Sequence, residues 1–144
     1  MTPTPPTLTD YVAFWTSLTP ASLTDLSRYY TADAYFRDPF NEVTGLAPIT
    51  VIFEAMFERL EAPRFEILET ISEGQSTFLI WDFTFRIQAF RPQLTRLIHG
   101  TTHVRFAPCG RVRYHRDYWD AASELYVHFP LIGGVLRYLR KRFA

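Results

Sequence analysis

Hydrophobic positions follow two different periods along the chain, a helical one before residue 64 and an alternating one after it. In the first part, apolar residues recur every three or four positions in three segments, and this spacing predicts three helices. The predicted helices lie at residues 9–18, 20–30 and 48–60. Thr7 or Thr9 can cap the first helix, and Pro63 halts the third.

Four segments with alternating polar and apolar residues follow, which predicts four strands at residues 64–71, 78–89, 96–106 and 111–119. Their connections are short, so neighbouring strands must run antiparallel. We therefore predict an α+β fold, in which a cone-shaped bent antiparallel sheet is covered by three N-terminal helices. Residues 1–144 form one predicted domain, with a loose N-terminus at 1–8 and a helical extension at 121–144.

The stretch from Tyr30 to Gly45 holds the first candidate for chemistry. A short strand is predicted at residues 34–37, and Asp38 follows it directly before Pro39. Proline restricts the preceding residue to an extended conformation, which fixes the carboxylate at the strand end. Asp38 is a candidate general base if an apolar pocket surrounds it, whereas aspartate before proline is also an ordinary turn former.

The last predicted hairpin brings a second set of polar residues together. Pairing across its four-residue turn places four pairs of residues opposite each other: Phe106 and Arg111, Thr102 and His115, Gly100 and Asp117, Ile98 and Trp119. Because strand side chains alternate between faces, Thr102, His115, Asp117 and Trp119 share one face. This face is predicted to line a pocket, with His115 and Asp117 as an acid/base pair or as a structural hydrogen bond in a filled core.

The order of these elements resembles the nuclear transport factor two-like superfamily, which includes SnoaL-like polyketide cyclases, ketosteroid isomerase and limonene epoxide hydrolase. Ketosteroid isomerases have a motif similar to Tyr11-Val12-Ala13 and an Asp-Pro after the first strand. The resemblance implies that Tyr11 is a hydrogen-bond donor to a ligand oxygen and that Asp38 is the general base. Thr102 stands where that family has its second oxyanion donor, a protonated aspartate.

Limonene epoxide hydrolases have a motif similar to Arg116-Asp117-Tyr118-Trp119-Asp120, and the resemblance places one of their catalytic aspartates on Asp117. Their second aspartate falls on Asp82, although Ile80 stands where their arginine lies. An inward Asp82 would turn the aromatic residues Trp81, Phe83 and Phe85 to the outer face, whereas hydrophobicity alone would turn them inward. We follow the resemblance, which implies a homodimer through the outer sheet face.

The predicted ligand is a small hydrophobic, oxygen-bearing molecule held in an apolar pocket. Trp119, Thr102, Asp82, Phe14 and Phe57 are predicted to bind it, and Asp38, Asp117, His115 and Tyr11 to act on it. The hypothesis is an acid/base isomerase, hydrolase or cyclase that needs no cofactor. The alternative is a non-catalytic module that binds a lipid-like ligand or dimerises, since one fold serves many functions.

Composition narrows the range of partners and compartments. The formal net charge is zero, which argues against nucleic acid as the partner. Residues 1–75 carry eleven acidic and four basic residues, and the remainder carries four acidic and eleven basic ones. The single cysteine, Cys109, and the lack of a signal-peptide pattern predict a cytoplasmic protein. No metal site is predicted, because His99 and His103 share the face opposite to His115.

The C-terminal segment, residues 124–144, extends beyond the compact relatives. Apolar residues alternate with the cations Arg137, Arg140, Lys141 and Arg142 at helical spacing, with breaks near Pro130 and Gly133-Gly134. Such a helix most often packs across its own domain or a sister subunit, with its last cations suited to the helix dipole. A peripheral contact with an anionic membrane is the less common alternative.

Overall fold

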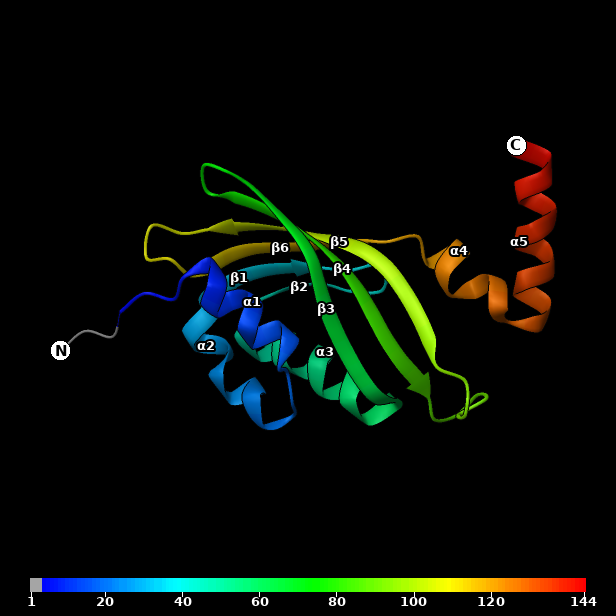
Figure 1. Cartoon of the computed structure of the whole chain (residues 1–144), viewed down its shortest axis with the longest axis horizontal. Helices are drawn as coiled ribbons and strands as arrows, with labels where there is room; N and C mark the ends of the chain where they lie inside the picture. The colour runs from blue at the N-terminus through cyan, green and yellow to red at the C-terminus, as the bar shows by residue number, and fades with distance from the viewer. Residues whose placement is uncertain (1–3) are drawn as a thin grey trace.

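The computed structural model describes residues 4–144 and contains one six-stranded mixed sheet with helices against its concave face (Figure 1). The helices are α1 (Leu8–Thr16), η1 (Ala21–Asp25), α2 (Leu26–Tyr29), α3 (Leu46–Arg59), α4 (Ala121–Glu124), η2 (Tyr126–His128) and α5 (Pro130–Phe143). The strands are β1 (Tyr30–Arg37), β2 (Glu42–Thr44), β3 (Leu60–Glu73), β4 (Ser76–Ile87), β5 (Arg96–Phe106) and β6 (Val112–Tyr118). The predicted α+β class is confirmed.

Local sequence signals account for where the first helices begin. Thr7 caps α1, and its side chain and that of Asp10 bond each other's backbone N–H groups in a capping box. The second predicted helix begins as the 3₁₀ turn η1 after Pro20 and continues as α2. The third begins at Leu46 rather than Pro48, directly after Gly45, whose φ of 106° suits glycine.

The strand order is β2-β1-β6-β5-β4-β3, and β3 to β6 form the predicted antiparallel meander. Two features were not predicted: the three-residue strand β2, and the parallel pairing of β1 with β6. A three-residue strand is too short to show a period, and the β1–β6 pair joins segments far apart in sequence. This pair places the end of β1 beside the polar residues of β6.

The predicted register of the last hairpin is wrong by two residues. Thr102 pairs with Asp117, and Val104 pairs with His115. The Ala107 N–H donates to the Arg111 carbonyl, and Phe106 pairs with Val112 instead of Arg111, which shifts the register by one residue. An irregularity between Arg105 and Phe106 shifts it by a second residue. A shift by an even number keeps each side chain on its face. Thr102, His115 and Asp117 therefore still share the concave face.

The orientation of β4 taken from the family resemblance is wrong, and the hydrophobicity pattern is right. Trp81, Phe83 and Phe85 are buried on the concave face, where they pack with aromatic residues of α1, α3 and β3. Asp82 therefore lies on the outer face. The aromatic stripe that suggested a dimer through that face is inside the protein, because burying it stabilises the fold far more than burying a carboxylate would.

The C-terminal segment leaves the sheet after β6 and is held to the body by aromatic contacts. Phe40 lies edge-on against Trp119 and Tyr126, and Phe90 stacks on Phe129. Beyond Phe129, α5 stands apart from the sheet and its helices (Figure 1). None of the helices formed by residues 4–144 has the length and apolar character needed to span a bilayer.

Candidate functional site

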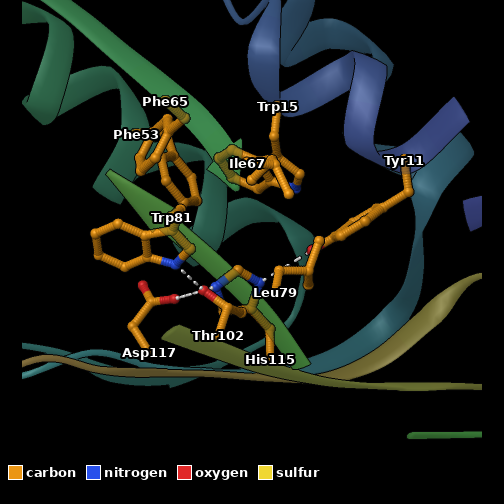
Figure 2. Close-up of a pocket in the computed structure, with 10 residues that line it drawn as sticks. All are labelled: Tyr11, Trp15, Phe53, Phe65, Ile67, Leu79, Trp81, Thr102, His115 and Asp117. Carbon is orange, nitrogen blue, oxygen red and sulfur yellow. Dashed lines mark hydrogen bonds and ion pairs between the residues drawn. The ribbon is translucent and has the colours of Figure 1, made fainter. Parts of the chain in front are cut away.

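A chain of hydrogen bonds crosses the concave face of the sheet (Figure 2). The Trp81 indole N–H on β4 donates to Thr102 Oγ1 on β5 at 2.8 Å, and that hydroxyl donates to Asp117 Oδ1 on β6 at 2.6 Å. The same carboxylate oxygen lies 2.9 Å from His115 Nε2. Three neighbouring strands thus converge on one carboxylate.

The chain continues from the other ring nitrogen of His115 toward the helices. His115 Nδ1 lies 2.8 Å from the Tyr30 hydroxyl at the start of β1, and the Tyr30 hydroxyl lies 2.8 Å from the Tyr11 hydroxyl on α1. The distance from Tyr11 to Nδ1 is longer, at 3.4 Å. Six side chains from α1 and four strands therefore form one continuous network.

Burial raises the pKa of both phenols well above the ordinary value, and each phenol is fully enclosed. Tyr11 and Tyr30 therefore keep their protons at neutral pH and act as hydrogen-bond donors rather than bases. His115 is also buried, with 4% of its surface exposed, whereas the Asp117 side chain is 18% exposed. The network is least exposed to solvent at the two tyrosines and slightly exposed at the Asp117 carboxylate.

Donor and acceptor counts assign the direction of each bond, since hydrogen positions follow from the network. The Nε2 proton of neutral His115 faces Asp117, so Nδ1 accepts from Tyr30 and the Tyr30 oxygen accepts from Tyr11. If His115 takes up a second proton, Nδ1 becomes a donor to Tyr30. Tyr30 then donates to Tyr11, and the Tyr11 proton is released for another acceptor.

Above the network lies a narrow cavity of about 30 Å³, room for one or two water molecules. Its walls are mostly apolar and come from both helices and strands: Tyr11, Trp15, Phe53, Phe65, Ile67, Leu79, Trp81, Thr102, His115 and Asp117. Two polar groups at this cavity have no hydrogen-bond partner among the described residues. They are the buried Trp15 indole N–H and the second carboxylate oxygen of Asp117.

A second, more open hollow of about 360 Å³ lies between the end of α1 and the start of β3. Trp15 and Phe65 line both spaces and contact each other edge-on, with ring centroids 5.6 Å apart. These two rings therefore form the partition between the small polar cavity and the larger hollow.

Four of the predicted site residues meet at the cavity: Tyr11, Thr102, His115 and Asp117. Asp38 does not line it. Its Oδ1 accepts from the backbone N–H groups of Phe40 and Asn41, both at 2.7 Å, and the Asn41 side chain also bonds it. The carboxylate thus holds the tight turn between β1 and β2, as the turn-former interpretation expects.

The remaining predicted ligand-binding residues also lie outside the cavity wall. Asp82 pairs with His99 on the outer face at 2.8 Å. Phe14 stacks on Tyr29 between helices, and Phe57 packs partly buried against the core one helical turn after Phe53. Trp119 lies beyond the end of β6, where a Cβ on Gly100 would collide with it.

Sequence reasoning missed Tyr30, which joins Tyr11 to His115, and Trp15, which lines both spaces. Tyr30 was placed at the end of a helix, whereas it begins β1 and points inward. A signal was present, because Tyr30 and Ala34 mark an apolar face along the first strand. The inward position of Trp81 also followed from the hydrophobic pattern, which the resemblance overrode.

The chain is similar in fold to several solved structures. A protein from Catenulispora acidiphila with a ketosteroid isomerase-like fold, solved with trimethylamine, has 20% identity and a TM-score of 0.69, covering 85% of this chain and 92% of that one. A candidate SnoaL-like polyketide cyclase from Shewanella putrefaciens has 21% identity and a TM-score of 0.65, covering 80% and 92%. A candidate SnoaL-like isomerase from Agrobacterium tumefaciens has 18% identity and a TM-score of 0.61, covering 76% and 91%.

No curated protein matches the chain. Within residues 4–144, no three His, Cys, Asp or Glu side chains are grouped so that they could hold a metal ion. The sequence profile of the SnoaL-like domain matches residues 9–115, which is most of the chain and runs from α1 through β5 to the part of β6 that holds His115. The chain therefore belongs to the SnoaL-like domain family, within the nuclear transport factor two-like fold.

Proposed function

We propose that this protein is a cofactor-independent acid/base enzyme, an isomerase, hydrolase or cyclase, acting on a small apolar molecule that carries an oxygen. The observation that carries the proposal is the continuous network from Asp117 through His115 and Tyr30 to Tyr11 beneath an apolar cavity. Burying ionisable side chains lowers the stability of the fold, and a role in proton transfer would explain why this protein buries them.

The two ends of the network supply the two halves of acid/base catalysis. The second oxygen of Asp117 accepts a proton from the substrate, because its other oxygen already holds Thr102 and His115 in place. As the carboxylate is neutralised, the proton that it shares with His115 Nε2 stays on the ring. Asp38 takes no part in this scheme.

The phenols and the indole stabilise charge that develops on the substrate oxygen. The Trp15 N–H has no other partner among residues 4–144 and donates to that oxygen. Where His115 carries a proton on both ring nitrogens before the reaction begins, Nδ1 donates to Tyr30 and Tyr30 donates to Tyr11, so that Tyr11 donates a hydrogen bond to the same oxygen. Both donors are buried, where a hydrogen bond to an oxyanion is strongest.

The cavity of about 30 Å³ is smaller than a substrate, so an organic molecule must move the Trp15–Phe65 partition or the Trp81 indole. Displacing the partition would join the cavity to the hollow of about 360 Å³. The small cavity also favours a second candidate, a binding module whose cone is filled by Trp81. That candidate requires ligand binding without turnover.

The test uses proton exchange, which needs no knowledge of the full reaction. Any small molecule that co-purifies with the protein is identified by mass spectrometry and incubated with fresh protein in deuterated buffer. NMR then follows exchange at carbon positions next to the ligand oxygen. Asp117→Asn should lower the exchange rate at least about a hundredfold, whereas Asp38→Asn and Asp82→Asn should leave it within about threefold.

Each outcome separates the alternatives. An equal loss of exchange rate in Asp38→Asn and Asp117→Asn would contradict the assignment, because Asp38 in the β1–β2 turn would then again be a candidate for the general base. Exchange in the wild type no faster than in protein-free buffer, with the ligand still bound, would establish the binding module, and wild-type exchange that persists in both variants would rule out both aspartates as the base. A Tyr11→Phe variant should lose part of the rate and keep ligand binding, since the phenol acts on developing charge.

A further inference from the structure

Helix α5 presents an apolar face to solvent instead of packing on its own domain. Its main packing contact is with the preceding turn η2, and only Gly133 is buried. The exposed fractions are 87% for Leu131, 52% for Ile132, 59% for Val135, 66% for Tyr138, 40% for Leu139 and 84% for Phe143. The common arrangement, in which such a helix covers its own core, is therefore not the one adopted.

These apolar residues form a continuous arc. With about 100° between successive residues, the side chains of the arc cover roughly 140° of the helix circumference. Gly133, Arg137, Arg140 and Lys141 lie on the opposite side. The helix has fourteen residues, which makes it about 21 Å long.

The helix holds a fixed orientation on the body. Gly133 lies so close to the Val127 carbonyl that a Cβ would collide with it, and the Arg137 guanidinium donates to the same carbonyl at 3.2 Å. Phe129, just before the helix, stacks on Phe90 of the β4–β5 loop. The polar side is thus held against the η2 turn, and the apolar arc faces away from it.

The positive charge of α5 indicates which kind of partner binds the apolar arc. The helix carries four cations and no acidic residue, and within residues 4–144 none of the four forms an ion pair. Arg142 falls inside the apolar arc, so a second helix packed there would bury its guanidinium. At a lipid surface the long side chain can instead reach the headgroups while its stem stays in the apolar layer.

We propose that α5 docks the protein on a membrane surface that contains anionic phospholipid. The helix lies in the plane of the interface, with Leu131, Val135, Leu139 and Phe143 among the acyl chains. Arg140, Lys141 and Arg142 contact lipid phosphates. This surface activity is independent of the proposed reaction, because no residue of α5 lines the cavity.

The experiment measures sedimentation of the full chain with vesicles of phosphatidylcholine alone and with vesicles that also contain phosphatidylglycerol. Val135→Asp is compared with Val51→Asp, because the two valines are exposed to nearly the same extent, 59% on α5 and 60% on α3. Arg140→Gln is compared with Arg113→Gln, another exposed arginine on β6. Circular dichroism confirms that each variant is folded.

We expect binding to the anionic vesicles only, weakened by added salt. Val135→Asp should lower the partition coefficient at least about tenfold and Arg140→Gln about fivefold, while both controls match the wild type. Absence of binding to anionic vesicles would overturn the proposal. So would equal loss in Val135→Asp and Val51→Asp, or a dimer in solution that Val135→Asp dissociates without vesicle binding, since the arc would then meet a second copy.

Discussion

Two aspartate–histidine pairs lie on opposite faces of the same sheet, and only one belongs to a network. His115 and Asp117 lie 2.9 Å apart on the concave face, with side chains 5% and 18% exposed. His99 and Asp82 lie 2.8 Å apart on the outer face, with side chains 56% and 26% exposed. The residue types are the same and the distances nearly so, whereas the surroundings differ.

The comparison shows that burial, more than the pair itself, decides what an aspartate–histidine contact can do. Water screens the outer pair and competes for its hydrogen bonds, so forming it changes stability little. On the concave face the two side chains are shielded from bulk solvent, so their polar atoms depend on protein partners. The outer pair thus provides matched controls for variants of the inner pair.

The largest expected difference is in stability. His115→Ala should lower the free energy of unfolding by about 3–5 kcal/mol, because it opens a cavity and removes the partners of Tyr30 and Asp117. His99→Ala should change it by less than about 0.5 kcal/mol. Urea unfolding of both variants measures these values, and equal losses would mean that the network contributes nothing beyond an ordinary surface pair.

Alkaline pH should weaken the concave face selectively. The unfolded chain releases phenol protons near pH 10, whereas burial keeps the Tyr11 and Tyr30 protons on the folded chain to higher pH. The folded state then binds more protons, so its stability is complete below pH 10 and falls above it. Each buried phenol contributes a slope of about 1.4 kcal/mol per pH unit.

Unfolding at several pH values above 10 measures that slope. Tyr11→Phe should remove about half of it. Tyr138→Phe should leave it nearly unchanged, because the Tyr138 side chain on α5 is 66% exposed. A slope that survives in Tyr11→Phe would show that the buried phenols do not control alkaline unfolding.

Two glycines should respond to alanine with opposite signs. A Cβ on Gly100 would lie 2.6 Å from the Trp81 ring and 2.9 Å from Trp119, so Gly100→Ala should cost about 2 kcal/mol through overpacking. Gly134 in α5 has nothing within 4 Å of a built Cβ, and Gly134→Ala should raise helix stability by up to about 1 kcal/mol. Thermal unfolding tests both, and a stabilised Gly100→Ala would mean that Trp81 is free to move.

Much of the fold could be predicted because its signals are local. The change of period near Arg64 located the meander, and Thr7 was identified as a possible helix cap. Because His115 and Asp117 share a strand, an error of two residues in the hairpin register left them on the same face. Such features depend on neighbours in sequence.

The remaining features depend on long-range contacts. Tyr30 reaches His115 through a parallel pairing of β1 with β6 that no local pattern marks. Asp82 was given the wrong face because a distant resemblance was preferred to the apolar pattern of its own strand. Asp38 looks the same in sequence whether or not it holds a turn, and only the folded chain shows its bonds to the N–H groups of residues 40 and 41.

The smallest expected effect concerns an arginine on the concave face, and its sign is informative. Arg96 is 8% exposed, and its Nε and Nη2 atoms are buried without a hydrogen-bond partner among residues 4–144. The Phe90 ring lies 5.4 Å from its guanidinium carbon and offsets only part of the cost of burying the charge. Arg96→Met keeps the apolar stem and removes that charge, so it should stabilise the fold by about 1 kcal/mol.

Arg86 supplies the comparison on the outer face. Its guanidinium lies 3.5 Å from Glu61, and both side chains are partly exposed, so Arg86→Met should change the free energy of unfolding by less than about 0.5 kcal/mol. Urea unfolding of the two variants measures the contrast. A loss of stability in Arg96→Met would mean that the buried guanidinium is compensated within the folded chain. A gain would mean that the concave face retains a charge which folding alone does not require.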